Sequence, residues 1–362
     1  MQLHFKTSAL LFLALLLNTE AKASDSKMQM FIAPPQRYVK WDSPAKLSYT
    51  FLLGWLKSHQ FNPLRRVKTA MGHGMVHVTC TDSKNAEHEF WTGITGSGDT
   101  ETDLVLKEKV GIGIIFMNFD NGYIQKEEEV KRTLSAYRGR LEKNQENETK
   151  RLKPLFIEFD LSAKECDDAV AFYSAFKNRS FEEPKPLETR KAMGENEKLY
   201  FGLTLEPYEL YKSNGPSGYL GGGCTSYASA FLKAAGKYDE KFDQFFKREI
   251  VASEKQMGGA GNRIGLAKLL LGKRGRSWVQ KFTDNLTLKF YDPEMMFSFL
   301  DSVRSCAGDT TSISECRPDV KDWSKNYDAE LTEITVSAPY KGIDYTNTIQ
   351  GVHLKRREAP RL

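Results

Sequence analysis

The stretch GYLGGGCTSYASAFLKAAG, residues 218–236, is the most unusual local sequence in this chain. Glycines 221 to 223 lead directly into Cys224, and the segment that follows, rich in Ala, Ser and Leu, is typical of a helix. A helix that begins at Cys224 or Thr225 would direct its dipole and its free N–H groups at the sulfur. Because a thiol attacks only as the thiolate, this position would activate it. The pattern indicates a nucleophilic cysteine; the alternative is a tight turn that packs a small apolar thiol into the core.

The first 23 residues have the pattern of a secretory signal peptide. A positively charged start, MQLHFK, precedes the apolar run ALLFLALLL at 9–17 and the small-residue cleavage signal AKA at 21–23. The apolar run is too short to span a bilayer, and no later segment is apolar enough to do so. We therefore expect an exported protein, periplasmic or extracellular, with no transmembrane span.

The chain has five cysteines, and export would permit disulfides between them. Cys306 and Cys316 lie ten positions apart in a polar stretch that a bridge could close. Cys80 and Cys166 form the second pair by elimination, which leaves Cys224 as the unpaired thiol. The alternative, five reduced or buried cysteines, is left open by the spacing.

Composition and charge restrict the class of protein. The chain has 362 residues, of which 40% are apolar and 27% charged, as in soluble globular proteins. The net charge of +5 includes basic clusters at 64–68, 272–276 and 353–362, which lack interleaved aromatic residues or a nucleic-acid motif. We expect no nucleic-acid partner, and at most weak contact with acidic envelope surfaces.

Hydrophobic periodicity predicts a mixed α+β fold, an antiparallel sheet with helices beside it. Strands are expected at 72–80, 88–96, 110–119 and 154–162, and at the start of 285–305, which continues as a Pro-initiated helix. Further helices are expected at 47–61, 123–151, 163–179 with a Ser162 N-cap, and 237–250. Residues 24–45, 180–198 and the tail from 306 look like irregular segments, and 199–211 looks extended.

A base for the cysteine should come from one of the six histidines. In GHGMVHV, residues 72–78, His73 opens a strand, and His77 lies about 13 Å further along it. We therefore expect His73 to act alone on Cys224. A metal site built from His73, His77, His88 and a cysteine is a competing interpretation, but the tight ligand spacings of zinc sites are absent. The sequence also lacks a G-x-S-x-G motif and a G-x-G-x-x-G motif, so we expect no metal and no cofactor.

The histidine strand followed far downstream by GGGCTSYASAFLKAAG resembles the circularly permuted branch of the papain-like superfamily, related to NlpC/P60 enzymes. That branch includes murein-related hydrolases of the YiiX type and lecithin:retinol acyltransferase-like proteins. The chain also resembles exported bacterial proteins with a late FYDPEMM segment, here 290–296. The resemblance covers roughly residues 70–240. It implies a papain-like domain over 24–256 with a charged helical insertion at 123–151, and a C-terminal extension over 257–362.

The same resemblance implies that Cys224 is the nucleophile and His73 the base, with backbone N–H groups at Gly223 and Thr225 holding the oxyanion. A third polar residue on the strand after His73 would orient the imidazole. His88, Glu89 and Thr92 are the candidates, and the acyltransferase-like proteins favour His88.

The expected function is hydrolysis or transfer at an amide or ester bond, with a peptide, peptidoglycan or acyl substrate. A non-catalytic peptide- or glycan-binding envelope protein that retains the fold is the alternative, and a purely structural envelope protein is a third.

Overall fold

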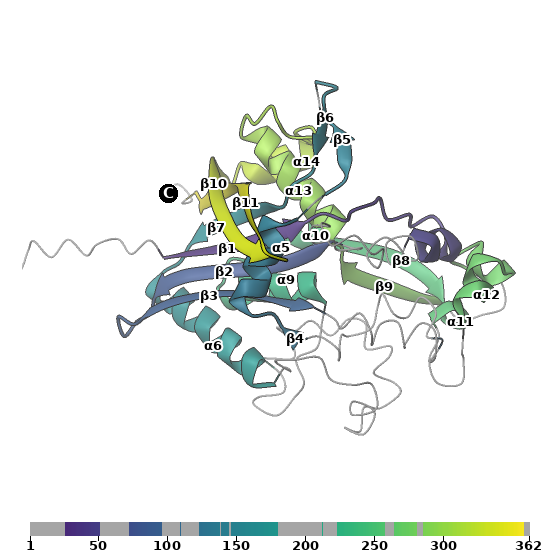
Figure 1. Cartoon of the computed structure of the whole chain (residues 1–362), viewed down its shortest axis with the longest axis horizontal. Helices are drawn as coiled ribbons and strands as arrows, with labels where there is room; N and C mark the ends of the chain where they lie inside the picture. Colours follow the sequence, from purple (N-terminus) through teal and green to yellow (C-terminus); the bar gives the residue numbers. More distant parts are fainter. Residues whose placement is uncertain are drawn as a thin grey trace, which may run out of the picture.

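The computed structural model describes residues 26–50, 72–95, 109, 123–137, 139–144, 146–179, 212, 223–257, 264–280 and 285–357. The centre of this part is a seven-stranded sheet with the strand order β10-β11-β7-β1-β2-β3-β4 (Figure 1). The strands are β1 (Lys27–Ala33), β2 (His73–Thr81), β3 (Glu87–Thr95), β4 (Tyr123–Ile124), β7 (Leu155–Asp160), β10 (Tyr327–Tyr340) and β11 (Ile343–Arg356). Neighbours are antiparallel except β11 and β7, which are parallel. The mixed α+β class and the mostly antiparallel sheet agree with the prediction.

Two small antiparallel sheets and several helices complete the described part. One sheet is the hairpin of β5 (Leu141–Lys143) and β6 (Thr149–Arg151), and the other pairs β8 (Lys247–Ser253) with β9 (Asn285–Tyr291), which follows it in the chain after three short helices. The helices are α5 (Glu127–Ser135), α6 (Ala163–Arg179), α9 (Cys224–Ala234), α10 (Phe242–Phe246), α11 (Glu254–Met257), α12 (Leu266–Leu270), η3 (Lys273–Gly275), α13 (Pro293–Cys306) and α14 (Pro318–Ser324). None of the helices in this part of the chain has the length and apolar character needed to cross a membrane.

Strand β1 lies in the middle of the sheet, between β2 and β7. Every residue of its sequence KMQMFIA except Lys27 is buried, as expected for a strand covered on both faces. The prediction of an irregular lead over 24–45 is therefore wrong for this segment. The prolines at 34 and 35 favoured an irregular assignment, but they follow the strand and only end it.

Alternation along β1 and β2 creates two separate cores on the two faces of the sheet. Residues such as Met30 and Val76 belong to the larger core, which includes apolar residues of α6, α9, α10, α13 and α14. Residues such as Phe31 and Met75 face the other way and pack with residues of α5 that include Val130. The sheet thus lies between α5 on one face and a layer of several helices on the other, and α9 packs against the larger core.

Aromatic side chains fix α9 against α6. The rings of Phe231 and Phe172 meet edge to face with centroids 4.9 Å apart, and Tyr227 lies 4.4 Å from Phe176. All four side chains are at most 1% exposed. Such pairs contribute roughly 0.5–1.5 kcal/mol each beyond the area that they bury. The start of α9, where Cys224 lies, is therefore held in a fixed position over the sheet.

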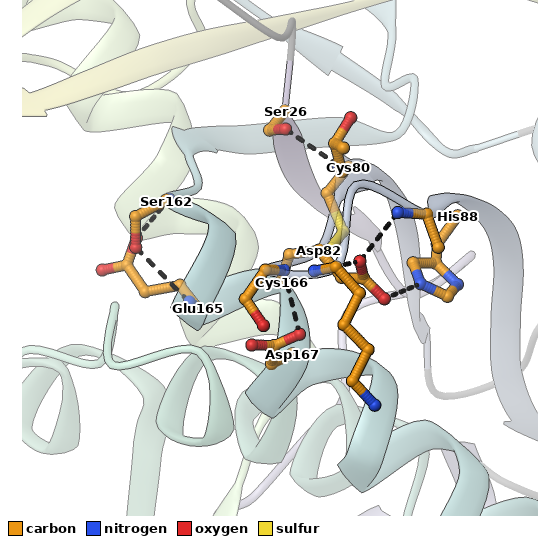
Figure 2. The surroundings of a disulfide bond; sticks show 12 residues. Ser26, Cys80, Asp82, His88, Ser162, Glu165, Cys166 and Asp167 are labelled. Carbon is orange, nitrogen blue, oxygen red and sulfur yellow. Dashed lines mark hydrogen bonds and ion pairs between the residues drawn. A yellow bond between two sulfur atoms is a disulfide. The ribbon is translucent and has the colours of Figure 1, made fainter.

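Two disulfides join the pairs that the sequence predicts. Cys80, near the end of β2, is bonded to Cys166 in α6, with Cα atoms 5.9 Å apart (Figure 2). Cys306 at the end of α13 is bonded to Cys316, and Cys224 is free. The predicted cap of α6 is also present: the N–H of Glu165 donates to Ser162 Oγ, and the Glu165 carboxylate accepts the N–H of Ser162.

Three predicted elements are wrong within the described residues. The long helix expected over 123–151 is only α5, followed by the β5–β6 hairpin, in which Asn147 adopts a positive φ of 62°. The helix expected over 237–250 shortens to α10, because β8 begins at 247 and pairs with β9. The tail from 306 contains α14 and two 14-residue strands rather than loops. The signal peptide, the strand at 110–119, the segments at 180–211 and most of the helix at 47–61 lie outside the described residues.

Candidate active site

Cys224 is the first residue of α9, as the glycine-rich sequence predicts. Gly223 is the N-cap, with extended backbone at φ −75° and ψ 167°. Its carbonyl accepts the N–H of Tyr227 at 2.9 Å and the hydroxyl of Ser226 at 2.8 Å. The N–H groups that precede Tyr227 in the first turn have no carbonyl partner within the helix. The half-buried thiol therefore lies at the positive end of the helix dipole.

The start of α9 rests directly on the backbone of β2 at Gly74. A Cβ atom at Gly74 would lie 2.9 Å from the carbonyl oxygen of Cys224 and 3.0 Å from the Cα of Thr225. Only glycine allows this approach, because both neighbours are main-chain atoms that cannot turn aside. The main-chain N–H of Gly74 is one of the groups that lower the pKa of Cys224. Strand and helix are thus joined at the thiol itself.

His73, the residue before Gly74, is hydrogen-bonded to Cys224 and is 5% exposed. Burial alone would lower the pKa of His73, but the charge and hydrogen bond of Cys224 and the hydrogen bond with Gln125 raise it. Burial would raise the pKa of Cys224, but the charge and hydrogen bond of His73 and the N–H groups of Gly74 and Thr225 lower it. These opposite shifts favour a thiolate paired with an imidazolium.

Gln125 holds the other side of the imidazole. Its Oε1 lies 2.6 Å from His73 Nε2, and both residues are buried. Because an amide oxygen can only accept, Nε2 carries a hydrogen, which leaves Nδ1 to exchange the proton of Cys224. The backbone N–H of Gln125 donates to the carbonyl of Gly93 at 2.9 Å. A Cβ atom at Gly93 would lie 2.6 Å from Gln125 Oε1, so this glycine provides the room for the amide.

The three residues expected to orient His73 lie elsewhere. His88 pairs with Cys80 in the sheet, seven positions or about 23 Å along β2 from His73, and hydrogen-bonds Asp82 at 2.9 Å (Figure 2). Glu89 contacts His77 at 3.3 Å on the face of the sheet that carries α5. Thr92 is fully buried and shares a 2.8 Å hydrogen bond with the hydroxyl of Tyr227.

The orienting residue instead follows β4, between that strand and α5. The prediction that this residue lies on the strand after His73 is wrong, because Gln125 is the residue that contacts the imidazole. Gln125 lies 52 positions from His73, so no local spacing could reveal the pair. The helix predicted over 123–151 includes Gln125, whereas in the structure this residue lies before the start of α5. The only sequence signal was the Glu-rich start of α5 directly after it, which marks a helix boundary.

Gly223 and Thr225 flank Cys224: Gly223 is the N-cap of α9, and Thr225 links the helix to β9. The N–H of Thr225 helps to lower the pKa of Cys224, and the hydroxyl of Thr225 donates to the carbonyl of Tyr291 at 3.0 Å. This hydrogen bond ties the start of α9 to the end of β9. Within the described residues, no group of three or more His, Cys, Asp or Glu side chains is arranged to hold a metal ion. The site therefore offers a polarised thiol, a proton acceptor and main-chain donors.

No family model, curated protein or solved structure matches this chain. The geometry around Cys224 is accordingly the basis for assigning a class of reaction.

Proposed function

We propose that the protein is an exported thiol hydrolase or acyltransferase that acts on an amide or ester bond, with the permuted papain-like arrangement suggested by its sequence. The observation that carries the proposal is the hydrogen-bonded Cys224–His73 pair at the start of α9. A buried structural thiol needs neither a histidine partner nor two main-chain N–H donors. Perturbed titration of both groups in one pair is typical of a catalytic site.

In the proposed reaction, the Cys224 thiolate attacks the carbonyl carbon of the substrate and forms a carbon–sulfur bond. The negative charge moves to the carbonyl oxygen, where N–H groups of the first turn of α9 stabilise it. The imidazolium of His73 gives its proton to the departing amine or alcohol as the bond to that group breaks. Water or an acceptor alcohol or amine then attacks the thioester, with neutral His73 taking its proton, and Cys224 leaves as the thiolate.

Gln125 acts on this reaction through His73. By accepting the Nε2 hydrogen, it holds the ring so that Nδ1 is directed at the sulfur, and it stabilises the imidazolium form. It is a positioning residue, because it contacts neither the sulfur nor the atoms that react.

A peptide of the cell envelope is the first substrate class, and an acyl ester is the second. The signal-peptide pattern and the two disulfides support export to an oxidising compartment, where cell-wall peptides are found. A permuted papain-like arrangement would suit amide and ester bonds equally.

Acylation of Cys224 tests the proposal. Wild-type protein mixed with p-nitrophenyl acetate at near-neutral pH should gain one acetyl group on the peptide that contains Cys224, as seen by mass spectrometry. Cys224→Ser should gain none there, and His73→Gln should react at least about 100-fold more slowly, because the sulfur loses the imidazolium that stabilises its thiolate. Release of soluble fragments from isolated peptidoglycan by the wild type, but not by Cys224→Ala, would identify the substrate class.

Iodoacetamide separates the proposal from a non-catalytic binding protein. An activated thiol is labelled quickly at pH values below its ordinary pKa of about 8.5. Slow labelling at neutral pH, together with no acetyl transfer, would refute thiol chemistry and leave a binding protein that keeps the fold.

A further inference from the structure

A cavity of about 350 Å³ opens beside the first two turns of α13. Its size suits one or two amino-acid residues rather than a long polymer. Tyr38, Phe245, Met295 and Ile313 supply apolar surface, and three arginines and two glutamates supply charge. All the lining residues belong to the described part of the chain.

The helix that forms this cavity also touches the candidate active site. A Cβ atom at Gly72, the residue before His73, would lie 2.8 Å from the Cβ of Pro293, the first residue of α13. Tyr291, two residues earlier, accepts the hydroxyl of Thr225. Met295 and Ser298 line the cavity, and Ser298 is five residues or about 8 Å along α13 from Pro293. A substrate of a few residues could therefore reach from the thiol into the cavity.

Two arginines present unused donors to this cavity. Arg248 uses Nε to bind Asp292, and its two terminal nitrogens have no other hydrogen-bond partner within the described residues. Arg317 binds Asp319 through Nε and Nη2, which leaves Nη1. Guanidinium groups recognise carboxylates better than any other side chain does. The two side chains are 26% and 38% exposed, so a ligand that enters from solvent can reach both of them.

The cavity lining also includes two carboxylates whose charge is already balanced in part. Arg140 contacts the carboxylates of both Glu142 and Glu294, the latter at 2.9 Å, and stacks on the ring of Tyr38 at 3.8 Å. This arrangement fixes the two carboxylates, so that they can accept peptide N–H groups without rearranging. A lining that combines guanidinium donors, carboxylate acceptors and apolar side chains suits a peptide terminus.

We propose that this cavity is a subsite that binds the C-terminal residue of a peptide through its free carboxylate, with Arg248 and Arg317 as the recognising groups. The inference rests on the proposed function, because it makes the peptide part of the substrate of Cys224. It predicts a preference for substrates that end close to the bond attacked.

Binding can be measured without any catalysis. Isothermal titration of full-length Cys224→Ala should detect N-acetyl-alanyl-leucine, in the L or the D configuration at its last residue. It should bind at least about tenfold more tightly than the matching C-terminal amide, since the amide loses the charged hydrogen bonds. Arg317→Gln should remove about tenfold of the affinity for the acid and little of that for the amide. Arg357→Gln, which breaks a surface ion pair with Asp328 outside the cavity, is the control and should change neither.

Equal affinity for acid and amide, or no binding of either configuration, would overturn the subsite. The acetylation of Cys224 by p-nitrophenyl acetate, which has no carboxylate, reports on the thiol independently. Acetylation without carboxylate-selective binding refutes the subsite alone, whereas selective binding without acetylation refutes the thiol chemistry alone.

Discussion

Replacing Gln125 by leucine should shift the reactivity of Cys224 to higher pH. The 2.6 Å contact between Gln125 Oε1 and His73 Nε2 is buried, and its acceptor stabilises the imidazolium. A hydrogen bond to a charged group contributes about 1.5–3 kcal/mol. At 1.36 kcal/mol per pKa unit, losing it should lower the pKa of His73 by about 1–2 units. The thiolate–imidazolium pair would then be about 10- to 100-fold less favoured relative to the neutral pair.

The rate of iodoacetamide labelling, measured from about pH 5 to pH 9, reports the thiolate directly. We expect the curve of Gln125→Leu to lie at higher pH than that of the wild type, and Gln125→Glu to recover reactivity at low pH because it keeps an acceptor. Thr92→Val is the matched control: it removes a buried hydrogen bond to Tyr227, in the first turn of α9, without touching His73. Coincident curves for Gln125→Leu and the wild type would show that the amide does not support the imidazolium, and the assignment of Gln125 would be withdrawn.

Three further predictions concern the frame of the site and its titration. Gly74→Ala should cost about 1–3 kcal/mol in urea unfolding and slow the labelling of Cys224, because the added Cβ displaces the start of α9. Gly265→Ala is the control and should change neither by much, since its Cβ would meet only Lys109 Cδ, at an ordinary contact distance of 3.9 Å. Equal stabilities of the two variants would contradict the close approach at Gly74. Loss of the Cys80–Cys166 bond should cost about 4–5 kcal/mol and loss of the Cys306–Cys316 bond about 3 kcal/mol, because the entropy cost of closing a loop grows with the logarithm of its length and the two loops span 86 and 10 residues. The reverse order in urea unfolding would argue against a loop-entropy origin. The rate of acylation by an alkyl ester or an amide, whose leaving group must be protonated, should be bell-shaped in pH. It should fall as the pH drops through the lowered pKa of Cys224 and again as the pH rises through the raised pKa of His73. A profile that only rises with pH would rule out the imidazolium as proton donor.

The two reacting residues could be found from the sequence because each has a local signature. His73 opens a strand of alternating apolar residues, and Cys224 follows glycines at a helix start. Gln125 had no such signature. It is uncharged, it lies outside the strand and the helix, and its place on the imidazole depends on how β4 meets β3 at Ile94. Because strand pairing in the folded protein positions Gln125 beside His73, no sequence motif of fixed spacing links the two residues.

The errors in the fold have a similar cause. Strand β1 is short and is followed by two prolines, so local preference favoured an irregular lead, although pairing on both edges determines its conformation. The strands β10 and β11 are rich in polar residues, because much of each strand is solvent-exposed. Their apolar residues, such as Val352 and Leu354, become recognisable as core only once β11 lies beside β7.

Residues 257–362, predicted to be a C-terminal extension, form part of the central sheet and of the core beneath the candidate site. They supply β10 and β11 to the central sheet, and apolar side chains of α13 and α14 to the same core that holds α9. The end of β9 accepts the hydroxyl of Thr225, and Pro293 packs beside Gly72, so both reacting residues have a direct neighbour supported by this segment. The spacing between thiol and imidazole is therefore set jointly by α9, β2 and the start of α13. Because the proposed carboxylate subsite lies along the same helix, any shift of α13 would change the reacting pair and the bound peptide together.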